Sequence, residues 1–462
     1  MKIIFVILTV FILMFSCDNM IRDSLPPINK EWTIMFYLGA DNDLEYELIN
    51  NVEQIKKGYD GSVNVIIFID RSKKYSSDEL VFGENFSGGR IYRVLKENKL
   101  ELLKDHTFFE NIPNTTATNI DSANILVLKK FIEFVKSTFP AEYYSLIIGS
   151  HGGGVRSKNI ITKNITTPLK DIVYDEEENS WIYTAMFTDF LDGSHSVDLL
   201  GFDACFMGNI EFLYQIRTGN NSFNARYVVT SPAMEWSYGW DYYSIFKRVK
   251  SSLTPNEFGE IIVQEYFNYT NQKSDDQILT LYDTSNIKSL KNNFDSLFVS
   301  LKDNYDEIKD IRGEGSISQN QTLLYFDTRY EREWLNYPYF DVYDICDKIS
   351  KSDNFDQSII EKAEIVKNDI NSVILSSFSG NYYRRFNKNI TGLSFFFPDG
   401  MRIYNGDKMW YSQKFYNALN DNNSYGKLSF CIDNATMNNQ IVENYFEVLN
   451  YWFDKENIRY SW

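Results

Sequence analysis

The 462-residue sequence contains few histidines and few cysteines, and it has fewer basic than acidic residues. Lysine and arginine total 46 against 63 aspartates and glutamates, so the chain carries a net charge of −17. That charge repels phosphate backbones and anionic lipid headgroups, which argues against nucleic acid as a partner. The acidic surface either attracts cationic substrates or is simply solvated. No internal repeat or long low-complexity run is present, which argues against a repeat architecture.

The longest apolar run lies at the N-terminus, in MKIIFVILTVFILMFSC. Residues 3–15 are fewer than the ~20 that span a bilayer core, so an export signal is favoured over a membrane helix. Ser16 followed by Cys17 resembles the cleavage region of a bacterial lipoprotein signal, in which the cysteine is lipidated. The alternative is an ordinary cleaved signal, which would give a secreted protein. We predict a signal peptide over 1–16, a tether over 17–31, and an exported lipoprotein anchored to a bacterial membrane.

Three cysteines remain once Cys17 is set apart: Cys205, Cys346 and Cys431. An odd number of thiols in an exported chain cannot pair completely, so at least one is free. We predict that this free thiol is Cys205, because of its place at the end of a predicted strand.

Apolar residues make up 44% of the chain, and several short apolar runs are typical of strands covered on both faces. They lie at residues 33–39, 63–70, 144–150, 197–203 and 225–231, with helical patterns between them at 41–57, 124–139 and 209–217. This alternation predicts an α/β sandwich with a mostly parallel central sheet flanked by helices. Residues 392–398 are expected to add a further strand to that sheet. Ligands in such sheets bind at the carboxyl ends of the strands.

Two of these strand ends carry reactive side chains. His151 directly follows one predicted strand in SLIIGSHGGG, and Cys205 follows another in DLLGFDACFMGN. If the two strands are neighbours, an imidazole and a thiol meet at one edge of the sheet. Each residue alone is more often inert, as a loop histidine or a buried apolar cysteine. Together they predict a cysteine nucleophile with a histidine as its proton carrier.

Residues around the pair suit the same chemistry. Cys205 is expected at the start of the helix that follows it, where unpaired amides favour a thiolate. The amides of Gly152 and Cys205 are candidates for an oxyanion hole. Asp203 lies two residues before Cys205 and should face the same cleft, where its carboxylate would favour a cationic substrate side chain. The alternative role for Asp203 is a helix cap.

The chain resembles the clostripain family of cysteine peptidases from about residue 32 to 400. The blocks that carry the resemblance are WTIMFYLGADNDLE, SLIIGSHGGG, DLLGFDACFMGNIEF, SPAMEWSYGWDY and ITGLSFFFPDG. The resemblance implies a caspase-like core and endopeptidase activity on proteins or peptides. It implies that His151 is the catalytic histidine, that Cys205 is the nucleophile, and that Asp203 receives a basic side chain, so that cleavage follows arginine or lysine. In SPAMEW, only Glu235 is left as a candidate acidic partner of Asp203.

The resemblance also implies calcium as a candidate cofactor and maturation by internal cleavage. No calcium loop of the EF-hand type occurs in the sequence. The acidic stretch YDEEENS, at residues 174–180, is either a cation site or a solvated loop. Self-cleavage is predicted in the polar segment between Val155 and Ser196. The lysines of that segment are Lys158, Lys163 and Lys170.

These observations predict a catalytic core over 32–250 and a C-terminal extension over 251–462 that contributes further strands and helices. The predicted function is a membrane-tethered cysteine endopeptidase. The alternative is a surface lipoprotein that keeps the fold as a binding or adhesion module without activity. The intact histidine and cysteine pair favours the peptidase, because a binding module needs neither residue at a strand end.

Overall fold

The computed structural model describes most of the chain downstream of residue 29. The described residues are 30–72, 74–75, 77–104, 120–155, 172–219, 221–271, 273, 276–312, 323–326, 338–384, 392–398, 425–436 and 441–453. The predicted signal peptide, Cys17 and the three lysines of the predicted self-cleavage segment lie outside the described residues. Within the described part, no helix is both long enough and apolar enough to cross a membrane.

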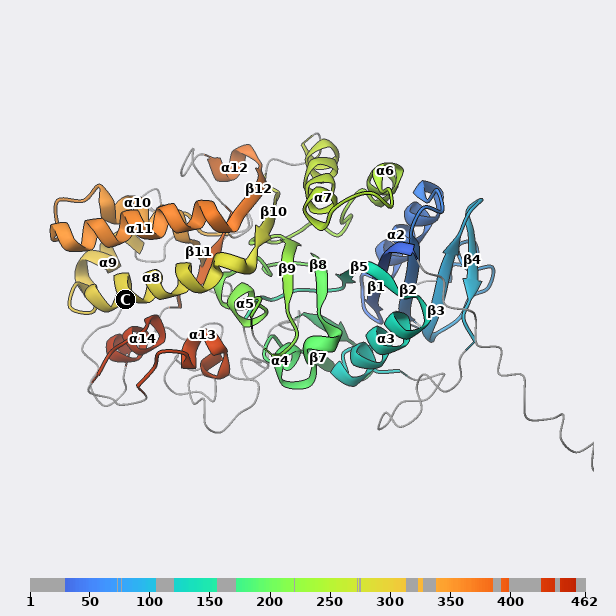
Figure 1. Ribbon diagram of the computed structural model, residues 1–462, viewed down its shortest axis with the longest axis horizontal. Helices are drawn as coiled ribbons and strands as arrows, with labels where there is room; N and C mark the ends of the chain where they lie inside the picture. Colours follow the sequence, from blue (N-terminus) through green and yellow to red (C-terminus); the bar gives the residue numbers. More distant parts are fainter. Residues whose placement is uncertain are drawn as a thin grey trace, which may run out of the picture.

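A nine-stranded sheet forms the centre of the protein, in the order β12-β10-β9-β8-β5-β1-β2-β3-β4 (Figure 1). The middle strands, from β9 to β2, are parallel, and antiparallel pairs complete both edges. The strands are β1 (Lys30–Ala40), β2 (Asn64–Arg71), β3 (Gly88–Leu95), β4 (Lys99–Leu102), β5 (Ala141–Gly149), β8 (Val197–Asp203), β9 (Ala225–Thr230), β10 (Ile278–Asp283) and β12 (Ile374–Ser379). The five strands expected from apolar runs are the five parallel ones, so the predicted sheet is confirmed.

Helices cover both faces of this sheet (Figure 1). One face packs against α2 (Glu45–Gly58), α6 (Tyr242–Arg248) and α7 (Pro255–Thr270). The other packs against α3 (Ile125–Thr138), α4 (Met186–Phe190), α5 (Ile210–Gln215), α8 (Ile287–Ser300), α10 (Val342–Ser350) and α11 (Gln357–Val373). Because both faces are buried, strand β1 shows no polar alternation, and its side chains divide between the two cores. Met35 and Tyr37 join one core, while Ile34 and Phe36 join the other.

Residues beyond 250 contribute to the sheet and also build a separate ribbon. Strands β10 and β12 extend the sheet at one edge. Strands β11 (Tyr339–Asp341) and β13 (Ser394–Phe396) form a two-stranded sheet, as do β6 (Val173–Asp175) and β7 (Ser180–Ile182). Among the described residues, further helices are α9 (Tyr305–Arg312), α12 (Asn381–Arg384), α13 (Ser429–Ile432), α14 (Tyr445–Phe453) and the 3₁₀ turns at Gly193–His195, Thr284–Asn286 and Tyr425–Lys427.

The expectation that residues 392–398 add a strand to the central sheet is wrong. Their strand, β13, belongs to the two-stranded ribbon, because β12 occupies the edge of the central sheet beyond β10. Phe395 and Phe397 pack into the aromatic core formed with Phe298 and Tyr445. The apolar run therefore predicts correctly that this strand is buried, but the strand pairs with β11 and not with a strand of the central sheet.

Candidate active site

The register of two neighbouring strands brings His151 and Cys205 to one place. Strands β5 and β8 pair in parallel, and Gly149 lies opposite Asp203 at their carboxyl ends. His151 and Cys205 each follow two residues later, so they occupy equivalent positions beyond the paired strands. The condition on which the predicted pair depends, that the two strands are neighbours, is therefore met.

The backbone after His151 lies directly against Cys205. A Cβ atom added to Gly152 would come within 2.6 Å of the Cys205 backbone nitrogen, a separation that real Cβ atoms do not adopt. Only glycine therefore permits this approach. The contact brings together the two backbone segments whose amides are the candidate oxyanion donors.

Cys205 lies in a turn and not at a helix N-terminus. Helix α5 begins at Ile210, and the Asn209 side chain caps it by accepting a hydrogen bond of 2.8 Å from Phe212 N. Between them, Phe206 adopts a left-handed backbone conformation with φ of 60°, which prevents the helix from starting at Cys205. The expected helix-dipole support for the thiolate is thus wrong. Instead, the backbone amide of Glu235 donates a hydrogen bond of 3.3 Å to Cys205 Sγ.

The His151 imidazole contacts a carboxylate from a third strand end. Its Nε2 atom is 2.6 Å from Oδ1 of Asp43, in the turn between β1 and α2. The histidine side chain is 17% exposed and the aspartate side chain 58% exposed, so the pair opens to solvent on the aspartate side. The ring of Tyr174, on β6, lies edge-on at a centroid distance of 6.3 Å.

Asp203 and Glu235 form a buried acidic pair beside Cys205. Tyr242 Oη donates a hydrogen bond of 2.9 Å to the Asp203 carboxylate. Both Glu235 carboxylate oxygens are buried and accept no hydrogen bond of good geometry within the described ranges. The Gly239 backbone packs directly against the Asp203 carboxylate, because a Cβ atom there would lie 2.7 Å from Oδ2. Asp203 does not cap α5, since Asn209 has that role.

Burial controls the electrostatics of this acidic pair. It raises the pKa of Asp203 to about 6, although Tyr242 and the Trp240 amide donate hydrogen bonds that oppose the rise. Burial, followed by repulsion from Asp203, raises the pKa of Glu235 well above its usual range. A cationic group placed between the two carboxyls would relieve this destabilisation and lower both pKa values.

Several supporting residues were not predicted from the sequence. Tyr339, on β11, accepts a hydrogen bond of 2.8 Å from Val155 N and donates one of 2.9 Å to Gly153 O, which holds the glycine loop after His151. Its ring also stacks on Phe206, with centroids 5.5 Å apart. Trp236, 37% exposed beside the acidic pair, is held by a 3.0 Å hydrogen bond from its indole to Asp276. Each contact joins positions far apart in the sequence, so no local signal could have found it.

Calcium binding stays a prediction from the family resemblance. No group of three or more histidine, cysteine, aspartate or glutamate side chains among the described residues is arranged to hold a metal. In the acidic stretch at 174–180, Asp175 points inward and accepts a hydrogen bond of 2.9 Å from Ser122 N. Glu176 instead bonds Lys74 and Tyr75 at the surface. No catalytic step is therefore assigned to calcium.

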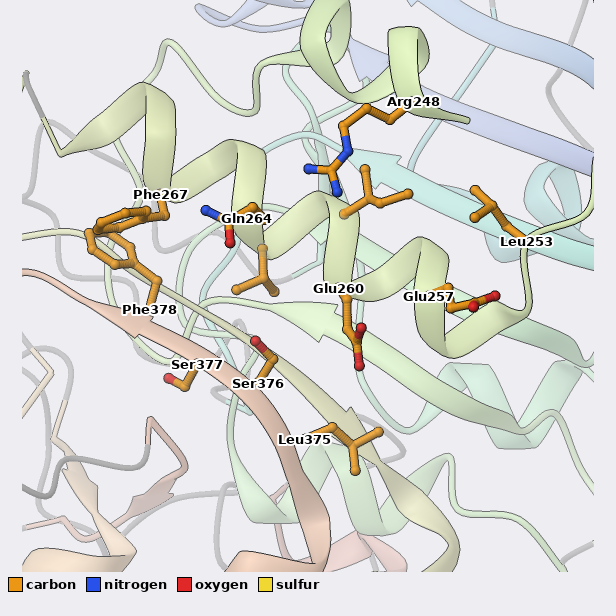
Figure 2. Close-up of a pocket in the computed structure, with 12 residues that line it drawn as sticks. Arg248, Leu253, Glu257, Glu260, Gln264, Phe267, Leu375, Ser376, Ser377 and Phe378 are labelled. Carbon is orange, nitrogen blue, oxygen red and sulfur yellow. The ribbon is translucent and has the colours of Figure 1, made fainter. Parts of the chain in front are cut away.

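A cavity of about 680 Å³ lies between α7 and β12 (Figure 2). Figure 2 shows Glu257, Glu260 and Gln264 on the helix and Ser376 and Phe378 on the strand. None of the predicted site residues lines it. The cavity is therefore separate from the candidate active site.

A thiol and an imidazole at neighbouring strand ends of a mostly parallel sheet define the class of the protein, a caspase-like cysteine peptidase. Comparisons with known proteins give the family. The model of the clostripain family matches residues 36–452. Clostripain of Hathewaya histolytica is 37% identical over 467 aligned positions, which cover 93% of this chain and 88% of that protein. The chain belongs to the clostripain family and is a cysteine-type endopeptidase.

Solved structures share the fold. The inactive zymogen of a C11 protease from Parabacteroides distasonis superposes with a TM-score of 0.55 at 17% identity, covering 81% of this chain and 94% of that one. A secreted C11 cysteine protease from Bacteroides thetaiotaomicron, solved with an irreversible peptide inhibitor, gives 0.56 at 15% identity, covering 83% and 97%. At these identities the likeness shows the architecture alone. It agrees with the predicted caspase-like sandwich.

Proposed function

We propose that this endopeptidase uses Cys205 as its nucleophile and His151 as its general base, and that it cleaves after arginine or lysine. The observation that carries the proposal is the register of β5 and β8, which places the two side chains at equivalent strand ends beside the Asp203 and Glu235 carboxyls. The family membership favours this function over the alternative of a non-catalytic binding module.

The mechanism follows from these positions. His151 takes the thiol proton, and the Cys205 thiolate attacks the carbonyl carbon of the scissile peptide. The amides of Gly152 and Cys205 donate to the oxyanion of the tetrahedral intermediate. The intermediate collapses to a thioester as the imidazolium gives its proton to the leaving amine. Water, deprotonated by His151, then attacks the thioester, releases the acid product and restores the thiol.

Specificity for basic residues is supported by the buried acidic pair. Two buried carboxyls in a region of low dielectric bind a cation strongly, and the hydrogen bonds that Asp203 accepts from Tyr242 and the Trp240 amide do not neutralise its charge. A guanidinium offers two parallel donors, so arginine should be preferred over lysine.

Anchoring through a lipidated Cys17 is the last part of the proposal. Strand β1 begins at Lys30. This residue lies where the parallel strands have their amino-terminal ends, opposite the carboxyl ends that carry the catalytic residues. A tether attached on that side of the sheet would leave the candidate active site facing away from the membrane. Mass spectrometry of the mature N-terminus tests this, since lipidation adds acyl mass at Cys17 and Cys17→Ser should abolish it.

Labelling with an electrophilic peptide that ends in arginine tests the catalytic assignment. The wild type should form one covalent adduct, mapped to Cys205. Cys205→Ala should lose both the adduct and turnover while keeping its melting temperature, and Cys346→Ala serves as the control because that thiol is buried. Turnover retained by Cys205→Ala would overturn the proposed function.

A further inference from the structure

Strand β1 brings a third side chain into the candidate active site. It pairs in parallel with β5 on the side away from β8, and Leu38 lies opposite Gly149. The chain after β1 therefore emerges at the same sheet edge as His151. There, Asp43 Oδ1 lies 2.6 Å from His151 Nε2, across 108 residues of sequence.

Asn42 fixes the turn that carries this aspartate. Its fully buried side chain donates hydrogen bonds to Gly39 O at 2.9 Å and to Tyr174 O at 2.8 Å, and its Oδ1 atom accepts one from Leu44 N at 3.0 Å. These bonds join the turn to β1, to β6 and to Leu44, the residue that precedes α2. The Asp43 carboxylate is exposed, but the backbone that presents it is held on both sides.

We propose that Asp43 is a positioning residue for the catalytic histidine. A carboxylate at Nε2 stabilises the ring form that carries its proton on that nitrogen, which leaves Nδ1 unprotonated for the Cys205 thiol. It also stabilises the imidazolium that forms when the thiol gives up its proton. The inference rests on the proposed function, because it requires His151 to be the base.

The other titratable and charged groups near the pair come from every neighbouring segment. Within the described residues they are Asp41 from the same turn, Lys74 and Tyr75 after β2, Tyr174 and Glu176 on β6 and its turn, and Cys205 and Glu235 on the far side. Glu176 is occupied by Lys74, at 2.9 Å, and by Tyr75. Asp43 is therefore the carboxylate whose removal should act most directly on the imidazole.

His195 provides an internal control. It also contacts carboxylates, with Nδ1 2.9 Å from Asp192 and Nε2 3.3 Å from Glu133, but it lies at a 3₁₀ turn before β8, at the end of that strand opposite Cys205. Its side chain is 3% exposed, so it is a structural histidine. Glu133→Gln removes a carboxylate from a histidine without touching the site.

The test compares Asp43→Asn, Asp43→Glu and Glu133→Gln in the full chain. Asp43→Asn should lower kcat on an arginine peptide by about ten- to a hundredfold with little change in KM, as expected for groups that orient a catalytic histidine. The limb of the pH–rate profile that reports imidazole protonation should move to lower pH, because a stabilising negative charge is lost. Asp43→Glu should recover part of kcat, and Glu133→Gln should match the wild type.

A second measurement separates positioning from folding. The rate at which a neutral alkylating reagent modifies Cys205 should fall in Asp43→Asn across pH 5 to 9, while the melting temperature stays within a few degrees of the wild type. An unchanged pH profile and alkylation rate would overturn the role of Asp43. Activity retained by His151→Ala would instead overturn the proposed function, so the two failures are distinguishable.

Discussion

The two halves of the chain contribute different things to the candidate site. Residues 32–250 supply the side chains proposed to react or to bind substrate: His151, Cys205, Asp203 and Glu235. Residues beyond 250 supply support, as when Tyr339 holds the glycine loop and Ser394 N donates a hydrogen bond of 2.9 Å to Gly208 O in the turn after Cys205. Reacting groups at strand ends and supporting groups on a distant ribbon should therefore respond differently to substitution.

After loss of the nucleophile itself, the largest expected effect is that of Gly152→Ala. The added methyl group would meet the Cys205 backbone, which cannot move without displacing the nucleophile. We expect kcat/KM to fall by about a thousandfold or more, since small displacements of reacting groups are costly. Steady-state kinetics with an arginine peptide measure this. Gly193→Ala is the matched control, because its nearest neighbour would be Asn221 O at 3.7 Å; comparable activity in the two variants would contradict the tight approach.

Asp203→Asn should have the next largest effect, and a selective one. Removing one partner of a buried charge pair costs about 2 to 5 kcal/mol, so kcat/KM on arginine and lysine peptides should fall by roughly thirtyfold or more. Because burial raises the pKa of Asp203 to about 6, the wild-type KM for such peptides should also rise as the pH falls below 6. Asp198→Asn, on the same strand at its other end, is the control. A wild-type substrate profile without enrichment for basic residues would refute the specificity.

The sequence predicts the positions of those site residues that directly follow a buried strand. Strand β8 coincides with the apolar run at 197–203, and His151 and Cys205 follow their strands directly, so their meeting needs only that β5 and β8 are neighbours. Apolar runs identify buried parallel strands because both faces are covered. Strands β3 and β4 gave no such signal, since β3 mixes buried and half-buried residues and β4 contains no buried residue.

What the sequence does not predict is set by contacts between distant segments. Asp43 meets His151 across 108 residues, and Tyr339 reaches Gly153 across 186. The partner of residues 392–398 and the start of α5 were mistaken for a related reason. Burial and helical periodicity give no information on which strand pairs with which, or on a left-handed residue such as Phe206 that delays a helix.

Tyr339→Phe tests the supporting half, with a smaller expected effect. The change removes the hydroxyl that bonds Val155 N and Gly153 O, leaving both backbone groups buried without that partner. We expect kcat to fall about tenfold and stability to fall by about 1 to 3 kcal/mol. Tyr59→Phe is the control, since its hydroxyl donates a hydrogen bond of 2.6 Å to Val63 O, just before the start of β2 and away from the site. If Tyr339→Phe lost as much activity as Gly152→Ala, the residues beyond 250 would be as important for catalysis as the backbone next to the nucleophile.

The smallest expected effect on activity is that of Asp175→Asn in the N-terminal half. The Asp175 carboxyl is buried together with that of Asp70. Burial raises the pKa of Asp175 to about 7 and that of Asp70 well above its usual range. The folded state therefore holds these protons more tightly than the unfolded chain, so their stabilising contribution is complete below about pH 4 and is lost as the pH rises through 7. Asp175→Asn cannot ionise, and its melting temperature should decline less steeply between pH 5 and 8.5 than that of the wild type.

Only the slope of this pH dependence is informative. The asparagine oxygen can accept both hydrogen bonds that Ser122 gives to Asp175 Oδ2, but the NH2 group cannot accept the one that Glu178 N gives to Oδ1, so the variant should be less stable than the wild type at pH 5. The difference should narrow toward pH 8.5, where the wild-type carboxylate is ionised and buried. Activity at neutral pH should change by less than about threefold, because Asp175 contacts none of the residues proposed to react. If the melting temperatures of the wild type and of Asp175→Asn change with pH in the same way, protonation of the buried carboxyls is not linked to folding. Packing and hydrogen bonds alone would then stabilise this part of the N-terminal half.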